Sequence, residues 1–319
     1  MKVEIGNNES GQRLDKFLRK WLKDVPISGI YKAIRKGDIR VNGKKAKEQY
    51  FLMDKDIVEA KYIVSERKVF QFNKVNGDFL KITYEDENMI LVEKWPGVLV
   101  HSDKRVKDAT LTDYVLSYLY DKEDFKPETE VTFTPSPCNR LDRNTSGIVI
   151  YGKNYGSLKL LNEIIRERRI RKYYQALVKG KINEGVYEGY ILKDRKNNIS
   201  NIYNSPEKNG KKIAMDVKVL HTCGTYSLLE LELITGRSHQ LRTHLAHLGN
   251  PIIGDAKYGI SKINSFFYNK YGLNYQYLYA YKVIFGDCTG KLSYMNNKTI
   301  SEKLPPIFKK IKNDIFNKF

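Results

Sequence analysis

The sequence predicts an α+β fold, in which a small N-terminal unit precedes a larger domain with a mostly antiparallel mixed sheet flanked by helices. Short strand-like and helix-like segments follow one another without the regular βαβ alternation that is typical of parallel sheets. Residues 227–233 alternate between apolar and polar side chains with a period of two, as a half-buried strand does. Residues 157–169 instead place four apolar side chains on one face of a helix, namely Leu158, Leu161, Ile164 and Ile165.

The composition indicates a polyanionic partner. The 319 residues include 56 Lys and Arg against 37 Asp and Glu, a formal charge of +19. Such an excess favours nucleic acid or an anionic membrane surface. A membrane is disfavoured, because no apolar run approaches the roughly 18 residues of a spanning helix and residues 1–8 lack the apolar core of a signal peptide. Three widely spaced cysteines, Cys138, Cys223 and Cys288, fit a reducing cytoplasm and offer neither a disulfide framework nor a Cys-based zinc site.

The chain opens with a helix–helix–strand–strand pattern. Residues 14–22 repeat apolar side chains at helical spacing, with basic residues on the other face. A second helix is predicted to begin at Ser28, a suitable N-cap, and to end at Gly37. Residues 39–44 predict a strand with an Asn-Gly turn, and residues 56–60 a second strand.

This pattern over residues 12–60 resembles the alpha-L RNA-binding motif, a small module shared by a ribosomal small-subunit protein and many RNA-modifying enzymes. The match rests on Arg-Leu-Asp at 13–15, Ile-Arg-Lys-Gly at 34–37 and Val-Asn-Gly at 41–43, and it departs at Lys55, where the family usually has glycine. The alternative is a small α/β subdomain with a solvated basic face. The resemblance implies RNA contacts from four basic side chains: Arg13, Lys16, Arg35 and Lys44.

Residues 61–79 lack clean periodicity, which predicts a linker to a domain over residues 80–319. Early in that domain, residues 89–94 predict a strand, a Trp-Pro-Gly turn follows, and residues 98–101 predict another strand. A further strand is predicted over residues 171–178.

Two more helices are predicted in the second half. One is entered through Gly236 and closed by Gly249. The other covers residues 303–319, is basic and amphipathic, and begins with two prolines. Whether the second helix packs against the domain is left open by the sequence.

Asp142 is the candidate for the chemistry. It lies in the run Asn-Arg-Leu-Asp-Arg-Asn-Thr-Ser-Gly at 139–147, in a turn before a predicted strand. Arg140 and Arg143 flank it, and a nearby cation favours the ionised form of a carboxylate. That form suits a nucleophile or a base and not a proton donor. Taken alone, however, such a segment is more often a turn with a surface ion pair.

Four separated motifs, in order, resemble the RluA-type family of pseudouridine synthases. They are a Lys-x-Pro-Gly turn at 94–97, an Arg-Leu-Asp loop at 140–142, a Lys-x-Tyr-x-Ala strand at 172–176 and a Gly-Arg-x-His-Gln-x-Arg helix at 236–242. The resemblance covers about residues 80–290. It departs at Asn139 and Asn144, where the family usually has His and Asp.

The resemblance implies an RNA pseudouridine synthase that needs no cofactor and no metal. Asp142 would act as nucleophile or base, Arg242 would pair with it, and Tyr174 would stack on the target base. Only motif register favours Tyr174 over Tyr173. Arg140 would fill the space left by the flipped uridine. The basic side chains expected to contact RNA in this domain are Arg140, Arg143, Lys172, Arg237 and His239.

Family members with the alpha-L module generally act on large-subunit ribosomal RNA, so this RNA is the first expected substrate and tRNA the second, with a monomeric enzyme. A catalytically inert RNA-binding or ribosome-assembly factor of the same fold remains the alternative. A metal-dependent hydrolase is suggested by three clustered histidines, His239, His244 and His247. The sequence has no His-Glu-x-x-His motif, however, which disfavours this alternative. The target uridine and the covalent course of the reaction are not determined by the sequence.

Overall fold

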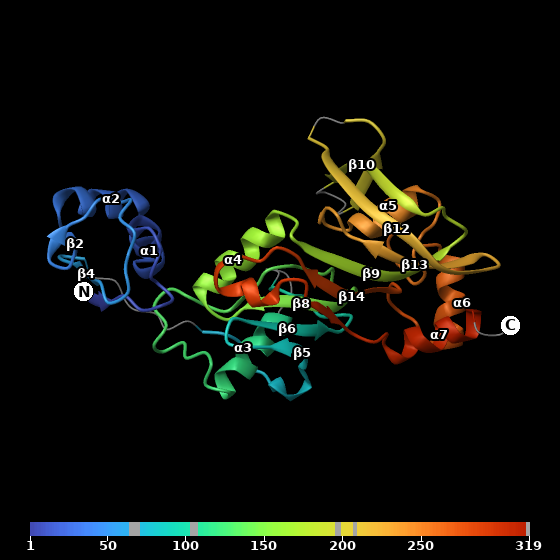
Figure 1. Ribbon diagram of the computed structural model, residues 1–319, viewed down its shortest axis with the longest axis horizontal. Coiled ribbons are helices and arrows are strands. Elements are labelled where there is room, and N and C mark those ends of the chain that lie inside the picture. Colours follow the sequence, from blue (N-terminus) through green and yellow to red (C-terminus); the bar gives the residue numbers. More distant parts are fainter. Residues whose placement is uncertain (64–70, 103–107, 195–198, 207–208, 317–319) are drawn as a thin grey trace.

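The computed structural model describes residues 1–63, 71–102, 108–194, 199–206 and 209–316. Figure 1 shows a small N-terminal part at one end and a larger part built around a long sheet, with the two termini at opposite ends. No helix among the described residues is long and apolar enough to cross a membrane.

The N-terminal part packs two helices on a small sheet. Its elements are β1 (Lys2–Glu4), α1 (Leu14–Trp21), α2 (Ile27–Lys36), β2 (Ile39–Val41), β3 (Lys44–Lys45) and β4 (Ile57–Ala60). The strands are antiparallel in the order β1-β4-β2-β3, so the sheet includes β1, which lies ahead of residue 12. Leu14, Phe17 and Leu18 of α1 are fully buried, as the helical spacing predicted.

The start of α2 and the backbone of Lys55 bear on two details of the predicted N-terminal unit. The predicted N-cap at Ser28 is wrong: α2 begins at Ile27 after Pro26, whose fixed φ suits a helix entry and whose carbonyl accepts from the Ile30 N–H at 3.1 Å. Lys55, where the related motif usually has glycine, takes the left-handed φ of 66° that glycine adopts most readily. The turn therefore holds a lysine in a backbone conformation that is strained for a residue with a Cβ.

The larger part is built on one long sheet. Its strands are β5 (Lys81–Glu85), β6 (Met89–Lys94), β7 (Ser136–Pro137), β8 (Ser146–Gly152), β9 (Ile170–Lys179), β10 (Gly185–Asp194), β11 (Ile199–Tyr203), β12 (Lys211–Cys223), β13 (Tyr226–Glu232), β14 (Leu278–Phe285) and β15 (Thr299–Ser301). The order is β11-β10-β12-β13-β9-β14-β8-β6-β5, with β15 on β14 and β7 on β8. Among the described strand pairs, β8 with β14 is parallel and the others are antiparallel. The prediction of a mostly antiparallel mixed sheet is confirmed.

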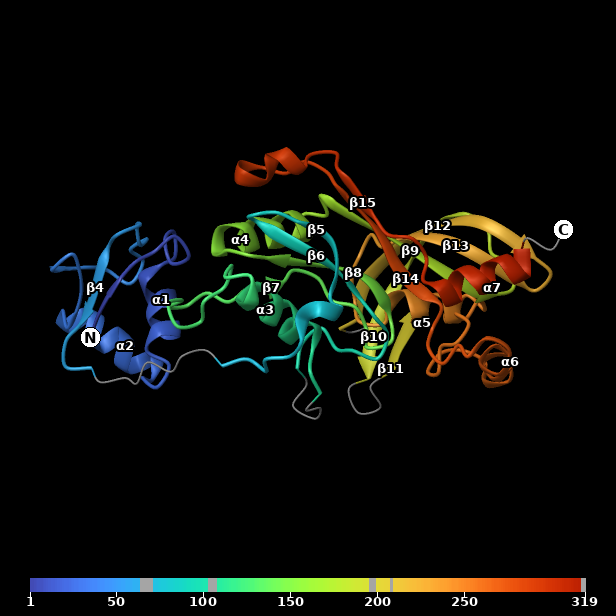
Figure 2. The ribbon, with the colours of Figure 1, turned by 90° about the horizontal axis from the view of Figure 1, so that it is seen from below.

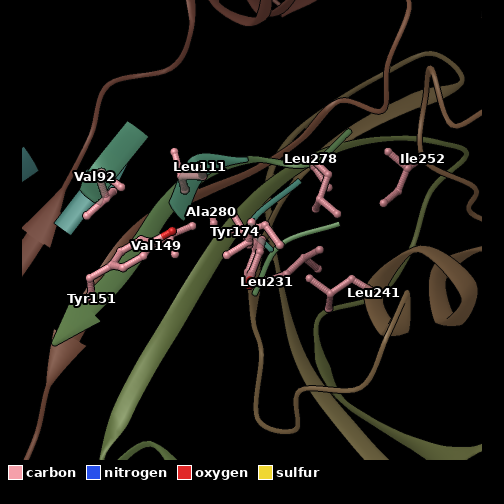
Figure 3. Packing of buried hydrophobic residues seen from close by; sticks show 14 of the residues in the cluster. Val92, Leu111, Val149, Tyr151, Tyr174, Leu231, Leu241, Ile252, Leu278 and Ala280 are labelled. Carbon is pink, nitrogen blue, oxygen red and sulfur yellow. The ribbon is translucent and has the colours of Figure 1, made fainter. Parts of the chain in front are cut away.

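β14 is inserted between β8 and β9, and this insertion joins the two halves of the sheet (Figure 1). The parallel pairing is close at Gly147, which has a φ of 124°; a Cβ there would lie 2.3 Å from the Ala280 carbonyl oxygen. Figure 3 shows the core that spans the junction, with Val149 of β8, Ala280 of β14 and Tyr174 of β9 in one cluster. The sheet therefore behaves as one unit beneath the site described below.

Helices cover the sheet and its ends. They are α3 (Leu111–Asp121), α4 (Tyr155–Arg166), α5 (Gln240–His247), α6 (Ser261–Tyr271) and α7 (Pro306–Phe316), with short turns η1 (Gly77–Phe79) and η2 (Gly290–Met295). The Asn154 side chain caps α4, so this helix begins earlier and ends earlier than the predicted 157–169. The C-terminal helix α7 packs on the domain (Figure 2), because Phe308 is fully buried and stacks on Tyr277 with ring centroids 3.9 Å apart.

The predicted strand at residues 98–101 is absent from this described segment. Its backbone groups have other partners. The Leu99 carbonyl accepts from the Leu111 N–H at 2.8 Å, and the Val100 carbonyl accepts from the Thr112 hydroxyl at 2.6 Å. The carbonyls of this apolar run therefore bind the first residues of α3 and do not pair with a neighbouring strand. The sequence pattern of residues 98–101 alone could not show this, because the partners lie in another segment.

Candidate active site

Asp142 lies in the loop between β7 and β8, at the wall of an open cleft of about 770 Å³. Within the loop, the Thr145 N–H donates to the Asp142 carbonyl at 3.0 Å. The turn after β6 holds the loop from outside: the Gly97 N–H donates to the Arg143 carbonyl at 3.0 Å, and Arg143 Nε donates to the Gly97 carbonyl at 2.9 Å. The carboxylate is thus presented by a loop that hydrogen bonds fix on both sides.

Lys94 binds the turn after β6 from the buried side. Its side chain is fully buried, and Nζ donates to the carbonyls of Trp95, Val98 and Arg143 at 3.0, 2.9 and 2.8 Å. Burial lowers the pKa of Lys94 to about 7, and the charge of Asp142 acts in the opposite direction. Three carbonyl acceptors match the three protons of an ammonium group, so this lysine ties the turn after β6 to the loop that carries Asp142.

Arg242, on α5, joins Asp142 to a second carboxylate, Asp255. Nη1 donates to Asp142 Oδ2 at 2.8 Å, while Nε and Nη2 donate to the two oxygens of Asp255 at 2.7 and 2.9 Å. Asp255 has an exposed fraction of 0%. Burial alone would raise the pKa of Asp255, but the bonds and charge of Arg242 hold it below its usual value. The bidentate pair fixes the guanidinium plane, so one N–H remains aimed at Asp142.

The charge partner of Asp142 is therefore Arg242 and not its neighbours in sequence. Arg143 turns away from the carboxylate to the Gly97 carbonyl and to Asp108, at 3.4 Å, and it does not line the cleft. Arg140 is exposed at the cleft wall. The expectation that Arg143 helps to hold the charge of Asp142 is wrong, because the loop uses this arginine to hold its own backbone.

Tyr174 is brought into the cleft from β9, and Tyr173 is turned away from it. Successive side chains on a strand point to opposite faces. Tyr174 is buried at the cleft wall, whereas Tyr173 donates to Glu232 at 2.9 Å and lies under the Lys282 ammonium at 4.2 Å from its ring centroid. Burial raises the pKa of Tyr174, and the charge of Asp142 raises it further. This hydroxyl consequently stays protonated at neutral pH, when it cannot accept a proton as a phenolate would.

The segment ahead of α5 corrects another expectation. Residues 236–239 form a turn and the helix begins at Gln240, because His239 adopts a left-handed φ of 58°. The Gln240 side chain closes that turn by accepting from the Arg237 N–H at 3.1 Å. Arg237 is therefore not on the helix that carries Arg242, although both line the cleft.

Tyr258 contacts two of these groups at once. Its ring lies 5.3 Å from the Arg242 guanidinium carbon, and its hydroxyl is 2.9 Å from His239 Nδ1. Burial lowers the pKa of His239, with the charge of Asp142 opposing. Sequence reasoning assigned no role to Tyr258 or to Asp255; the available signal was the Gly-Asp and Lys-Tyr-Gly continuation at 254–259, in the same family pattern.

The wall of the cleft is basic. Of the predicted RNA contacts, those that line it are Arg140, Lys172, Arg237 and His239. Cations that the sequence did not single out as contacts also line it, namely Arg166, Arg168 and Arg171. The signal for the first two was the Arg-Glu-Arg-Arg run at the end of the predicted helix. Burial removes water from the Lys172 ammonium and thereby lowers its pKa. A bound phosphate could replace the lost hydration.

The four candidate RNA contacts of the N-terminal part lie far from the cleft in sequence and differ in their surroundings. Lys16, Arg35 and Lys44 are exposed. Arg13 instead makes two hydrogen bonds to the buried carboxylate of Asp15, at 3.1 and 3.0 Å. Arg13 therefore has a structural partner, while the other three are free to meet solvent or RNA.

The histidines of the α5 region have separate partners. His239 contacts Tyr258, and His247 Nε2 is 3.2 Å from Asn204 Oδ1. His244 is buried, and burial lowers its pKa to about 4. In the part of the chain that the structure describes, no group of three His, Cys, Asp or Glu side chains is placed to hold a metal ion.

Known proteins resemble this chain over most of its length. A family model described as RNA pseudouridylate synthase matches residues 88–247, and a model described as S4 domain matches residues 12–58. An uncharacterized RNA pseudouridine synthase of Mycoplasma capricolum is 34% identical over 94% of this chain and 96% of its own length. The ribosomal large subunit pseudouridine synthase C of Vibrio vulnificus is 31% identical over 97% of this chain and 96% of its own. The solved structure of human RNA pseudouridylate synthase domain containing 4 has the same fold, with a TM-score of 0.57 and 23% identity over 74% of this chain and 92% of that one.

Proposed function

This chain belongs to the RNA pseudouridylate synthase family, and on that premise we propose that it converts specific uridines of large-subunit ribosomal RNA to pseudouridine, with Asp142 as the reacting carboxylate. Support for the substrate comes from the Vibrio vulnificus relative, whose name specifies the large ribosomal subunit and which matches nearly the whole chain, S4 domain included. Transfer RNA is the second candidate substrate.

The reaction moves one bond and oxidises nothing. The C1′–N1 bond of the uridine breaks, the uracil turns within the cleft, C5 bonds to C1′, and the proton on C5 is lost while N1 gains one. Asp142 acts on the sugar or the base as nucleophile or base. Arg242 Nη1 donates to Oδ2, which orients the carboxylate at the wall of the cleft. This ion pair, held from behind by Asp255, is the observation that carries the proposal.

The target nucleotide must leave its stack to reach Asp142, at a cost of a few kcal/mol. Tyr174 offers an aromatic face at the cleft wall on which the extruded base can stack. Arg140 is exposed on the same loop as Asp142 and lines the cleft, which supports a role in filling the vacated position and binding a neighbouring phosphate. The remaining basic side chains of the cleft bind the backbone on either side of the target.

An inert RNA-binding or assembly factor is the competing function. Its basic cleft would serve equally well, but a carboxylate there would only repel phosphate. Several buried side chains position Asp142, namely Asp255, Arg242 and Lys94. A factor that only binds RNA has no need for such a positioned carboxylate, so this arrangement favours the enzymatic function.

Replacing Asp142 with asparagine tests the proposal. Pseudouridine is measured by chemical mapping of large-subunit ribosomal RNA and tRNA transcripts after incubation with each protein. We expect Asp142→Asn to abolish isomerisation and to leave RNA affinity equal or higher, because a negative charge is removed from the cleft. Asp121→Asn is the matched control, since this exposed carboxylate of α3 pairs with Lys74 and does not line the cleft. Unchanged turnover in Asp142→Asn would reject the assigned role, and product in tRNA alone would reject the assigned substrate.

A further inference from the structure

We propose that the outer face of α4 binds RNA and connects the N-terminal domain to the cleft, so that one RNA molecule is held at both ends of this helix. The inference rests on the proposed function in that the ligand is RNA. The surface, called the α4 track below, consists of Lys16, Lys20, Tyr155, Lys159, Asn162 and Arg166. Figure 1 shows α4 on the side of the large sheet that faces the N-terminal domain.

At its N-terminal end, α4 contacts the N-terminal domain directly. The Tyr155 N–H donates to Asn8 Oδ1 at 3.1 Å, and Lys20 Nζ lies 5.4 Å from the centroid of the Tyr155 ring. Asn8 also donates to both oxygens of Glu130, at 2.9 and 3.0 Å. These contacts hold α1 of the N-terminal domain next to the first turn of α4.

A second set of contacts strengthens this junction. The buried carboxylate of Glu9 accepts from the N–H and the hydroxyl of Thr132, both at 3.1 Å, and the Gln12 amide donates to the same hydroxyl at 3.4 Å. Glu9 is thereby covered, although its charge still acts on Lys20: burial lowers the pKa of Lys20, and the Glu9 carboxylate opposes this effect. The junction fixes where RNA would pass from one domain to the other.

The outward face of α4 follows from helical spacing. Ser157, Leu161 and Ile164 are buried against the sheet. Tyr155, Lys159, Asn162 and Arg166 recur at intervals of four, three and four residues, which places them in one row on the opposite face. Lys159, Asn162 and Arg166 are exposed. At about 1.5 Å per residue, the row is roughly 16 Å long.

Charge along the row has one sign. None of its side chains is acidic, and Glu163 beside it is half-buried. On α1, Lys16 lies one turn before Lys20 and is exposed, so it extends the row into the N-terminal domain. At the other end, Arg166 lines the cleft with Arg168 and Arg140. Cations, an amide and an aromatic ring in a line are the groups that bind a nucleic-acid backbone and its bases.

The consequence is that the substrate reaches well beyond the flipped uridine. RNA in the cleft would leave past Arg166, cross Lys159 and arrive at Lys20 on the N-terminal domain. Each phosphate bound on the way releases counterions, so each lost contact should lower the steepness of the salt dependence of binding.

The test measures binding of the full-length protein to a large-subunit ribosomal RNA transcript at several salt concentrations. Lys159→Gln and Lys20→Gln are compared with Lys262→Gln, a matched exposed lysine on α6 outside the track. We expect each track variant to weaken binding several-fold and to reduce the slope of log K against log salt by about 0.7–0.9, the effect of one phosphate contact. The double track variant should lose about twice that slope, and Lys262→Gln should bind as the wild type does.

Equal slopes for the Lys159 and Lys262 variants would overturn the proposal, because they would show that only the total charge matters. Failure of the proposed function looks different: the wild type would form no pseudouridine in either RNA, whatever the slopes are. A reduced slope for Lys20→Gln together with an unchanged slope for Lys159→Gln would also overturn the track, since it would place the RNA on the N-terminal domain without crossing α4.

Discussion

Replacing Asp255 with asparagine is expected to damage both stability and turnover, although Asp255 itself lies behind the reacting carboxylate. The substitution keeps an oxygen for the Lys257 and Tyr258 N–H groups, which donate to Oδ1 at 2.9 and 3.1 Å. It puts an NH2 group where Oδ2 accepts from Arg242 Nε at 2.7 Å, so that two donors face each other. The buried guanidinium then has Asp142 as its remaining carboxylate partner within the described site.

The magnitude follows from burial. Breaking a buried ion pair by removing one partner costs about 3–5 kcal/mol, because it leaves the other charge uncompensated. For a domain of this size each kcal/mol lowers Tm by about 2–4 °C, so a fall of roughly 6–20 °C is expected. The loss of alignment at Arg242 is also expected to slow the single-turnover rate by about 100-fold, since misplacement by about 1 Å costs that much.

Thermal unfolding and single-turnover pseudouridine formation measure these two effects. Asp56→Asn is the matched control: Asp56 is also buried, but its partners are the neutral groups of Asn42, Tyr50 and Met53. That variant should lose only about 1–3 kcal/mol and no rate. An Asp255→Asn protein that melts within about 2 °C of the wild type and reacts at the same rate would refute the reasoning.

Two further predictions concern Tyr174 and His244. Tyr174→Phe keeps the ring and removes a hydroxyl whose pKa burial and Asp142 raise, so the single-turnover rate is expected to stay within about tenfold; a loss of 100-fold to 10,000-fold would instead identify the hydroxyl as a general base. His244 has a folded pKa of about 4 against 6.5 for an exposed histidine, so the unfolded chain binds its proton first and stability is lost as the pH falls through this window. Denaturant unfolding should show that the wild type loses about 2 kcal/mol more than His244→Leu between pH 7 and pH 5; parallel losses would contradict the assignment.

Much of the architecture was predictable because it depends on local patterns. The buried faces of α1 and α4, the Asn-Gly turn between β2 and β3 and the alternation of β13 follow directly from side-chain order. The family resemblance is confirmed by both family models and by relatives that match nearly the whole chain. The local pattern was misleading where residues from other segments supply the hydrogen bonds. At residues 98–101, for example, the carbonyls accept from Lys94 and from the start of α3, and no strand forms.

The geometry of the site was less accessible to sequence reasoning. Asp142 and Arg242 are separated by 100 residues, and motif order alone suggested that they pair. Asp255 could not be assigned a role, because its importance arises from burial and from its two bonds to Arg242. Arg143 was misassigned for the opposite reason: its place next to Asp142 suggested a charge partner, whereas its side chain binds the Gly97 carbonyl.

The position of β14 also constrains when the enzyme can become active during synthesis. β8 and β9 are made well before β14, yet neither pairs with the other; β14 has to enter between them. Until residues 278–285 are present, the strand that follows the Asp142 loop and the strand that carries Tyr174 lack the partner that joins them in this sheet. The cleft that both residues line is therefore an arrangement that the chain can complete only after this late strand is made.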